Sequence, residues 1–143
     1  MLNPGRPLLT ADFARSILDC SNEHLTDLID EGLIQPVWNI CTPGAKLREL
    51  RILAAGLLFY QTTQRPLPAD PKEVAGDIFA PDALITTATL QRVLNCHHQH
   101  VSQLIALKSL TLAPGETMRR GRNGFAKVTR SSCLAFLEKR LVI

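Results

Sequence analysis

The chain has 143 residues and a mass of 15.8 kDa, enough for one ordinary domain or two small ones. It is 45% hydrophobic and 20% charged, with a net charge of +3, so it can bury a core and wholesale disorder is not expected. Length excludes a TIM barrel, and the longest apolar run, 52–60, is too short to span a bilayer. The first residues lack the pattern of a signal peptide, so we expect a cytoplasmic protein without a membrane partner.

The positive charge is spread unevenly along the chain. Residues 1–70 carry 6 Lys and Arg against 8 Asp and Glu, whereas residues 71–143 carry 10 against 5. The second half is therefore the better candidate for contact with a polyanion, although two differently solvated surfaces would give the same asymmetry. The four cysteines include no Cys-x-x-Cys pair, so we expect reduced thiols packed as small apolar residues, with a disulfide framework as the weaker alternative.

An internal repeat organises the sequence. Shifting the chain by 76 residues aligns 9–34 with 85–110 without a gap, and six positions are then identical, where average composition gives about one or two. We expect two copies of one unit: a first domain over 1–62, a linker with a short helix over 63–80, and a second domain over 81–143. The identical pairs are Thr10/Thr86, Leu18/Leu94, Cys20/Cys96, His24/His100, Leu28/Leu104 and Ile29/Ile105.

The first copy is predicted to open with two short helices. Thr10 is a good N-cap, and apolar residues recur at helical spacing from there to Asp19, a residue type that tolerates the left-handed conformation. Ser21 is a natural N-cap for the second helix. Two short helices joined by a tight turn predict a helix-turn-helix. A hairpin with strands over 36–40 and 47–53 should follow, and then a closing helix.

The linker and the second copy follow in the same manner. Three prolines stiffen the linker, and Asp70 with Pro71 is typical of a helix start, so a short helix is expected through Phe79, packed on one of the copies. In the second copy His97 is a poorer N-cap than Ser21, and Thr129 should cap the last helix. Strands are expected over 111–113 and 125–128, around a basic tip.

A family signature covers the first helix and the turn after it. Residues 9–21 read Leu-Thr-Ala-Asp-Phe-Ala-Arg-Ser-Ile-Leu-Asp-Cys-Ser, and residues 127–137 read Lys-Val-Thr-Arg-Ser-Ser-Cys-Leu-Ala-Phe-Leu. These segments resemble the helix-turn-helix start and the strand-to-helix end of phage excisionases and MerR-like regulators. The resemblance implies a mainly α fold with small β-hairpin wings, present as tandem winged helix-turn-helix domains. It also implies sequence-specific binding of double-stranded DNA, without a cofactor.

The second helix of the second copy, which would be the recognition helix, is the main candidate site. Its polar face could contact base edges, as Gln does with adenine, and the basic hairpin tip could hold phosphates, although a merely solvated face would look the same. The predicted DNA-binding residues are His98, Gln99, Ser102, Gln103, Arg119, Arg120, Arg122, Asn123, Lys127 and Arg130. Weaker candidates in the first copy are Asn22, Thr26, Lys46, Arg48 and Arg51.

The first copy differs in charge. Its second helix carries Glu23, Asp27, Asp30 and Glu31, which a phosphate backbone would repel, so DNA contact by this copy stays open. The alternative function is therefore a protein-interaction module that reuses the fold. In that case the acidic first copy would bind a protein partner or mediate self-association.

Metal binding and catalysis have little support in the sequence. Cys96, His97 and His100 could offer zinc ligands, but no second ligand cluster follows. No pattern places a nucleophile beside a base, and no phosphate-binding glycine loop is present. We therefore expect no metal site, no cofactor and no catalytic residue. The chain is predicted to be a transcriptional regulator or an excisionase-like architectural factor in recombination, and not an enzyme.

Overall fold

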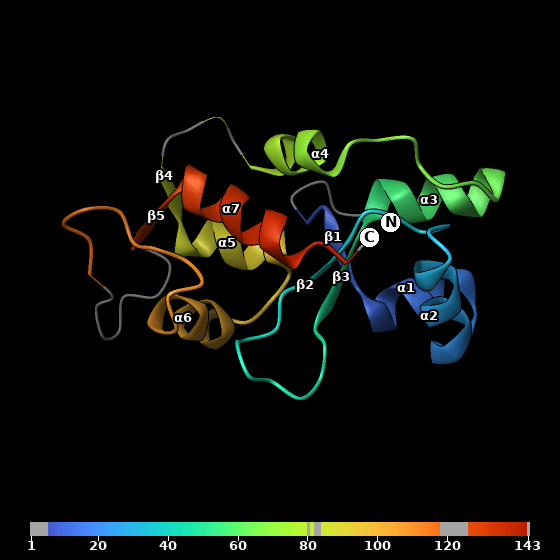
Figure 1. Cartoon of the computed structure of the whole chain (residues 1–143), viewed down its shortest axis with the longest axis horizontal. Helices are drawn as coiled ribbons and strands as arrows, with labels where there is room; N and C mark the ends of the chain where they lie inside the picture. The colour runs from blue at the N-terminus through green and yellow to red at the C-terminus, as the bar shows by residue number, and fades with distance from the viewer. Residues whose placement is uncertain (1–5, 80, 82–83, 118–125, 143) are drawn as a thin grey trace.

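The computed structural model describes residues 6–79, 81, 84–117 and 126–142 (Figure 1). About half of the described residues are helical, and two small antiparallel sheets accompany the helices. The chain is therefore mainly α with small β-hairpins. Its longest described helix has 11 residues, so none in this part of the chain is long and apolar enough to cross a bilayer.

The first copy starts with two capped helices, as predicted. The Thr10 hydroxyl accepts a hydrogen bond from the Phe13 N–H, and the Ser21 hydroxyl accepts one from the His24 N–H. Asp19 lies between the two helices in the left-handed conformation, with φ of 51°. The elements are β1 (Leu8–Thr10), α1 (Ala11–Leu18), α2 (Asn22–Asp30), β2 (Val37–Asn39), β3 (Leu50–Leu53) and α3 (Ala54–Thr63).

The second copy has the same order of elements. Thr86 caps its first helix, and Asn95 ends that helix with φ of 52°, which matches Asp19. Lys108 has φ of 62° where the first copy has Gly32 with φ of 75°. A single bridge between Leu112 and Val128 replaces the longer ladder that pairs β2 with β3. The elements are β4 (Leu84–Thr86), α5 (Thr87–Leu94), α6 (His98–Ala106), β5 (Lys127–Thr129) and α7 (Arg130–Arg140).

The sheets differ from the predicted hairpins. A short strand precedes the first helix of each copy, so β1 pairs with β3 and β4 pairs with β5. Neither strand was predicted, because three residues are too few to show an alternating pattern. Within the described residues, the predicted strand over 111–113 is reduced to the bridge at Leu112.

The linker forms α4 (Pro71–Ile78), with the Asp70 carboxylate accepting a hydrogen bond from the Lys72 N–H. This helix packs on the second copy, along α7 (Figure 1). Ala75 and Phe79 are buried there. The Arg130 guanidinium donates a hydrogen bond of 2.7 Å to the Gly76 carbonyl, and so ties the start of α7 to the linker helix.

The sheet of the first copy is buried on both faces. Because side chains alternate along a strand, Leu9 and Ile52 pack against the helices of their own copy, whereas Leu8 and Trp38 point the other way. This second face joins the hydrophobic core of the second copy, and Trp38 is 1% exposed there. The two copies therefore share a core, with the first sheet between them.

Candidate nucleic-acid interface

The interface predicted from the sequence is centred on α6. The His97 ring caps this helix, because its Nδ1 accepts a hydrogen bond from the Gln99 N–H. Val101 and Leu104 are buried against the rest of the second copy. Gln99 and Gln103 are exposed, one helical turn apart. The amide groups of these two side chains are thus presented side by side to solvent.

Other predicted residues of α6 are less accessible. His98 and Ser102 are half-buried, and the His97 and His98 rings lie 4.1 Å apart. His100 is half-buried as well, and its Nε2 contacts the Ile40 carbonyl of the first copy. Ile40 begins the loop between β2 and β3, so that loop starts beside α6.

The loop from the first copy carries two cations. Lys46 and Arg48 are both exposed in the loop that follows Ile40. The sequence assigned these residues to a wing that would serve α2 of its own copy. The contact between the start of this loop and α6 depends on how the copies pack, and the repeat pattern contains no signal for it.

The structure describes two of the basic residues predicted around the second hairpin, and they differ in exposure. Lys127 is exposed on β5, whereas Arg130 is half-buried and donates to the Gly76 carbonyl. Arg130 therefore has a structural role in addition to any contact with a ligand. The predicted tip residues lie outside the described part of the chain: Arg119, Arg120, Arg122 and Asn123.

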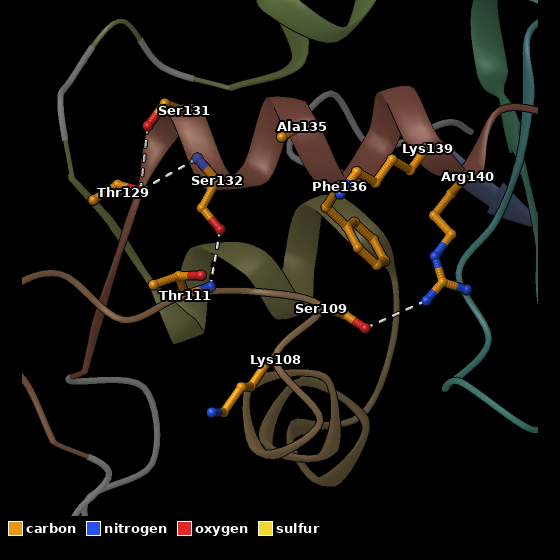
Figure 2. A pocket seen from close by; sticks show the side chains of 10 residues that line it. All are labelled: Lys108, Ser109, Thr111, Thr129, Ser131, Ser132, Ala135, Phe136, Lys139 and Arg140. Carbon is orange, nitrogen blue, oxygen red and sulfur yellow. Dashed lines mark hydrogen bonds between the residues drawn. The ribbon is translucent and has the colours of Figure 1, made fainter.

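A polar hollow of about 560 Å³ lies between α7 and the turn that follows α6 (Figure 2). Lys108 borders it from the turn, and Lys139 and Arg140 border it from α7. Among the described residues that line the hollow, none has a carboxylate, and several have a hydroxyl group. Such a lining is suited to an anion. The sequence interpretation missed Lys108 and Lys139, although their positive charge is visible in it.

Arg140 is largely occupied within the protein. Its guanidinium donates to the Cys41 carbonyl at 2.8 Å and to the Ser109 hydroxyl at 3.3 Å, and it lies over the Phe136 ring. Lys108 and Lys139 are exposed. These two lysines are therefore the more accessible cations at the hollow.

The matching helix of the first copy has the opposite charge. Glu23 and Asp27 occupy the positions of Gln99 and Gln103, and both are exposed. Asn22 is exposed, but the Thr26 hydroxyl donates to the Asn22 carbonyl and is only half-accessible. The face of α2 that matches the polar face of α6 thus presents carboxylates to solvent.

Arg51 was wrongly predicted to be a candidate for DNA contact. Its side chain is 8% exposed, and its Nε donates to the carbonyls of Leu94, at 2.8 Å, and Asn95, at 3.2 Å. Those carbonyls belong to the carboxyl end of α5, where a cation is favourable. Arg51 therefore joins the two copies, and a strand residue in a basic hairpin gives no sign of this in the sequence.

The cysteine and histidine residues near α6 do not gather into a metal-binding cluster. Among the described residues, no group of three or more His, Cys, Asp or Glu side chains is arranged to hold a metal ion. Burial raises the pKa of the Cys96 thiol to about 11 and that of Cys133 to about 12. Both side chains are thus neutral thiols at neutral pH.

Comparison of the chain with family models, curated proteins and solved structures found no match.

Proposed function

We propose that the chain is a sequence-specific double-stranded DNA-binding protein made of two tandem winged helix-turn-helix domains. In this proposal α6 enters the major groove, and the second copy dominates the contact. The observation that supports it best is the pair of exposed amides on α6, Gln99 and Gln103. The amide of each glutamine can donate a hydrogen bond to N7 of adenine and accept one from the N6 amino group at the same time, a contact that distinguishes adenine from other bases.

Electrostatics favours α6 over α2 as the helix that reads DNA. The helix α6 has no acidic residue, and the exposed Lys108 lies in the turn that follows it. Duplex DNA carries one charge per about 1.7 Å of its axis, so repulsion of Glu23 and Asp27 should disfavour a similar approach by α2. Exposed cations that a duplex on α6 could meet are Lys108 and Lys139 at the hollow, Lys127 on β5, and Lys46 and Arg48 in the loop that starts at Ile40.

Selection of bound sequences from a random duplex pool would provide the preferred site. The affinity for that site and for a scrambled duplex is then measured for two matched double variants. Gln99→Ala with Gln103→Ala should lose preference for the selected site, by about 1–3 kcal/mol for each bidentate contact removed. Glu23→Gln with Asp27→Gln changes the matched positions of α2 and should retain that preference, while binding both duplexes at least as tightly.

The opposite pattern would contradict the proposal. If the α2 variant loses the selected site and the α6 variant keeps it, the first copy reads the DNA. If selection recovers no preferred sequence, the chain is not a sequence-specific binder. Circular dichroism of each variant shows that the helices remain folded, so that a loss of preference is not a loss of structure.

A further inference from the structure

The contact between the two copies uses one face of the first sheet, the turn between α5 and α6, and the carboxyl end of α7, where the Val142 N–H donates to the Val37 carbonyl at 2.8 Å. Arg51 donates to the Leu94 and Asn95 carbonyls, and the Asn95 side chain donates in return to the Leu8 carbonyl at 3.2 Å. His100 contacts the Ile40 carbonyl at the edge of this contact. The first copy thus contributes the sheet face, and the second copy contributes a different surface that packs against it.

The first copy has the same accepting surface, and it is open. A cavity of about 310 Å³ lies there, and no described residue of the other copy fills it. The residues that line this cavity match, at an offset of 76, residues of the second copy at the surface that packs against the first sheet. Four of the six identical pairs of the repeat fall on this surface: Leu18/Leu94, Cys20/Cys96, His24/His100 and Leu28/Leu104.

The identity at His24 and His100 is informative because neither residue is part of the buried core. His100 is half-buried through its contact with the first sheet, whereas His24 is exposed beside the open cavity. Cys20 and Cys96 are likewise only partly buried. The first copy thus retains the features of an acceptor that the fold of a single copy does not require.

The second copy has a smaller matching sheet, of two described strands, and the described residues of its outer face include exposed ones. Leu84 corresponds to Leu8, yet Leu84 is 42% exposed and Leu8 is fully buried. Lys127 corresponds to Arg51, and it is exposed where Arg51 is buried. The second sheet therefore has an apolar residue and a cation in the places that carry the contact within the chain.

The charges of the two free surfaces are complementary. Asp19 borders the open cavity where Asn95 borders the filled one, and Lys127 replaces Arg51 as the cation. A lysine placed like Arg51 would face the carbonyl end of α1 and the Asp19 carboxylate together. Both groups attract a cation, because the carboxyl end of a helix is the negative end of its dipole.

We propose that the open cavity of the first copy binds the outer face of the β4–β5 sheet of another molecule of this chain. The contact would use the matched parts of the one within the chain, without the contacts of Trp38 and Val142, whose matched residues are Pro114 and Pro66, and molecules would join head to tail. A contact between two different surfaces leaves one of each free at every step, and it generates rings or open chains in place of a closed two-fold dimer. This inference does not depend on DNA binding.

Sedimentation of the full chain without DNA tests the proposal, at protein concentrations up to about 1 mM to include weak contacts. We expect the average mass to rise with concentration beyond that of a dimer. Leu84→Glu disables the donating face, and Gln61→Trp fills the accepting cavity with a bulky ring from an exposed position on α3. Each variant alone should stay monomeric.

An equimolar mixture of the two variants distinguishes this arrangement from others. Leu84→Glu keeps a working acceptor and Gln61→Trp keeps a working donor, so the mixture should form 1:1 dimers that do not grow. Thr62→Trp and Leu107→Glu are matched controls, with the same new side chains at exposed positions outside both surfaces, and should associate like the parent chain.

Three results would overturn the inference. They are a parent chain that remains monomeric at the highest concentration, association that neither variant reduces, and a mixture of the variants that fails to form dimers. Because no DNA is present, none of these results bears on the proposed DNA binding, which the duplex selection tests separately.

Discussion

The buried Arg51 offers the most direct perturbation of the contact between the copies. Its guanidinium makes hydrogen bonds to the carbonyls of Leu94, Asn95 and Leu50, and it lies 3.4 Å from the Glu49 carboxylate. Arg51→Ala removes the donor that the Leu94 and Asn95 carbonyls share across the interface. Each buried acceptor left without a partner costs about 1–3 kcal/mol, so for the two carbonyls we expect the free energy of unfolding to fall by about 2–6 kcal/mol.

Urea unfolding followed by tryptophan fluorescence measures this loss. Trp38 is the single tryptophan of the chain and is buried between the copies, so its emission reports on this interface. Arg48→Ala is the matched control, because Arg48 lies in the same hairpin but is exposed, and its loss should change stability by less than about 0.5 kcal/mol. If Arg51→Ala is as stable as the control, Arg51 does not join the copies as we describe.

Three further predictions concern backbone packing, thiol protonation and phosphate contact. Gly56→Ala should destabilise the chain, since a Cβ there would lie 2.1 Å from the Gln35 carbonyl oxygen. Gly76→Ala should instead stabilise α4 by about 0.5–1 kcal/mol, because alanine favours a helix more than glycine does. Thermal melting of the two variants checks this contrast, and equal melting temperatures would contradict it. The raised pKa values of Cys96 (about 11) and Cys133 (about 12) stabilise the fold fully below about pH 9, the ordinary thiol value, and this contribution is lost as the pH rises through 11 and 12. Cys133→Val should therefore flatten the decline of the urea midpoint above pH 9, and an unchanged decline would refute the assignment. Lys108→Ala and Lys139→Ala should each lower the salt slope of DNA binding by about 0.9 if they contact phosphates, whereas Lys72→Ala, on the linker helix, should leave it unchanged.

Local structure could be predicted from the sequence because its signals are local. The caps at Thr10, Ser21 and Thr129 are confirmed, and they depend on residues only three positions apart along the chain. Asp19 and Asn95 end the first helices in the left-handed conformation, as their residue types indicate. The helices were therefore predictable from caps and apolar spacing alone.

The arrangement of the copies could not be predicted in this way. Arg51 and Lys127 occupy matched positions, yet one is buried between the copies and the other is exposed. The difference arises because the first sheet is covered by the second copy, and no repeat pattern specifies which face is covered. The same long-range packing brings the Ile40 carbonyl to His100, whereas the hollow at Lys108 and Lys139 is formed within the second copy.

The measurement that tests DNA binding most directly is the affinity of the full chain for a labelled duplex at a series of salt concentrations, followed by fluorescence anisotropy. Our account predicts binding at low salt, with the logarithm of the association constant falling linearly with the logarithm of salt concentration. The slope should be about −0.9 for each phosphate contacted. It should also be shallower for Arg120→Ala with Arg122→Ala, which removes two cations of the predicted hairpin tip. A chain that fails to retain the duplex at the lowest salt concentration would contradict the account.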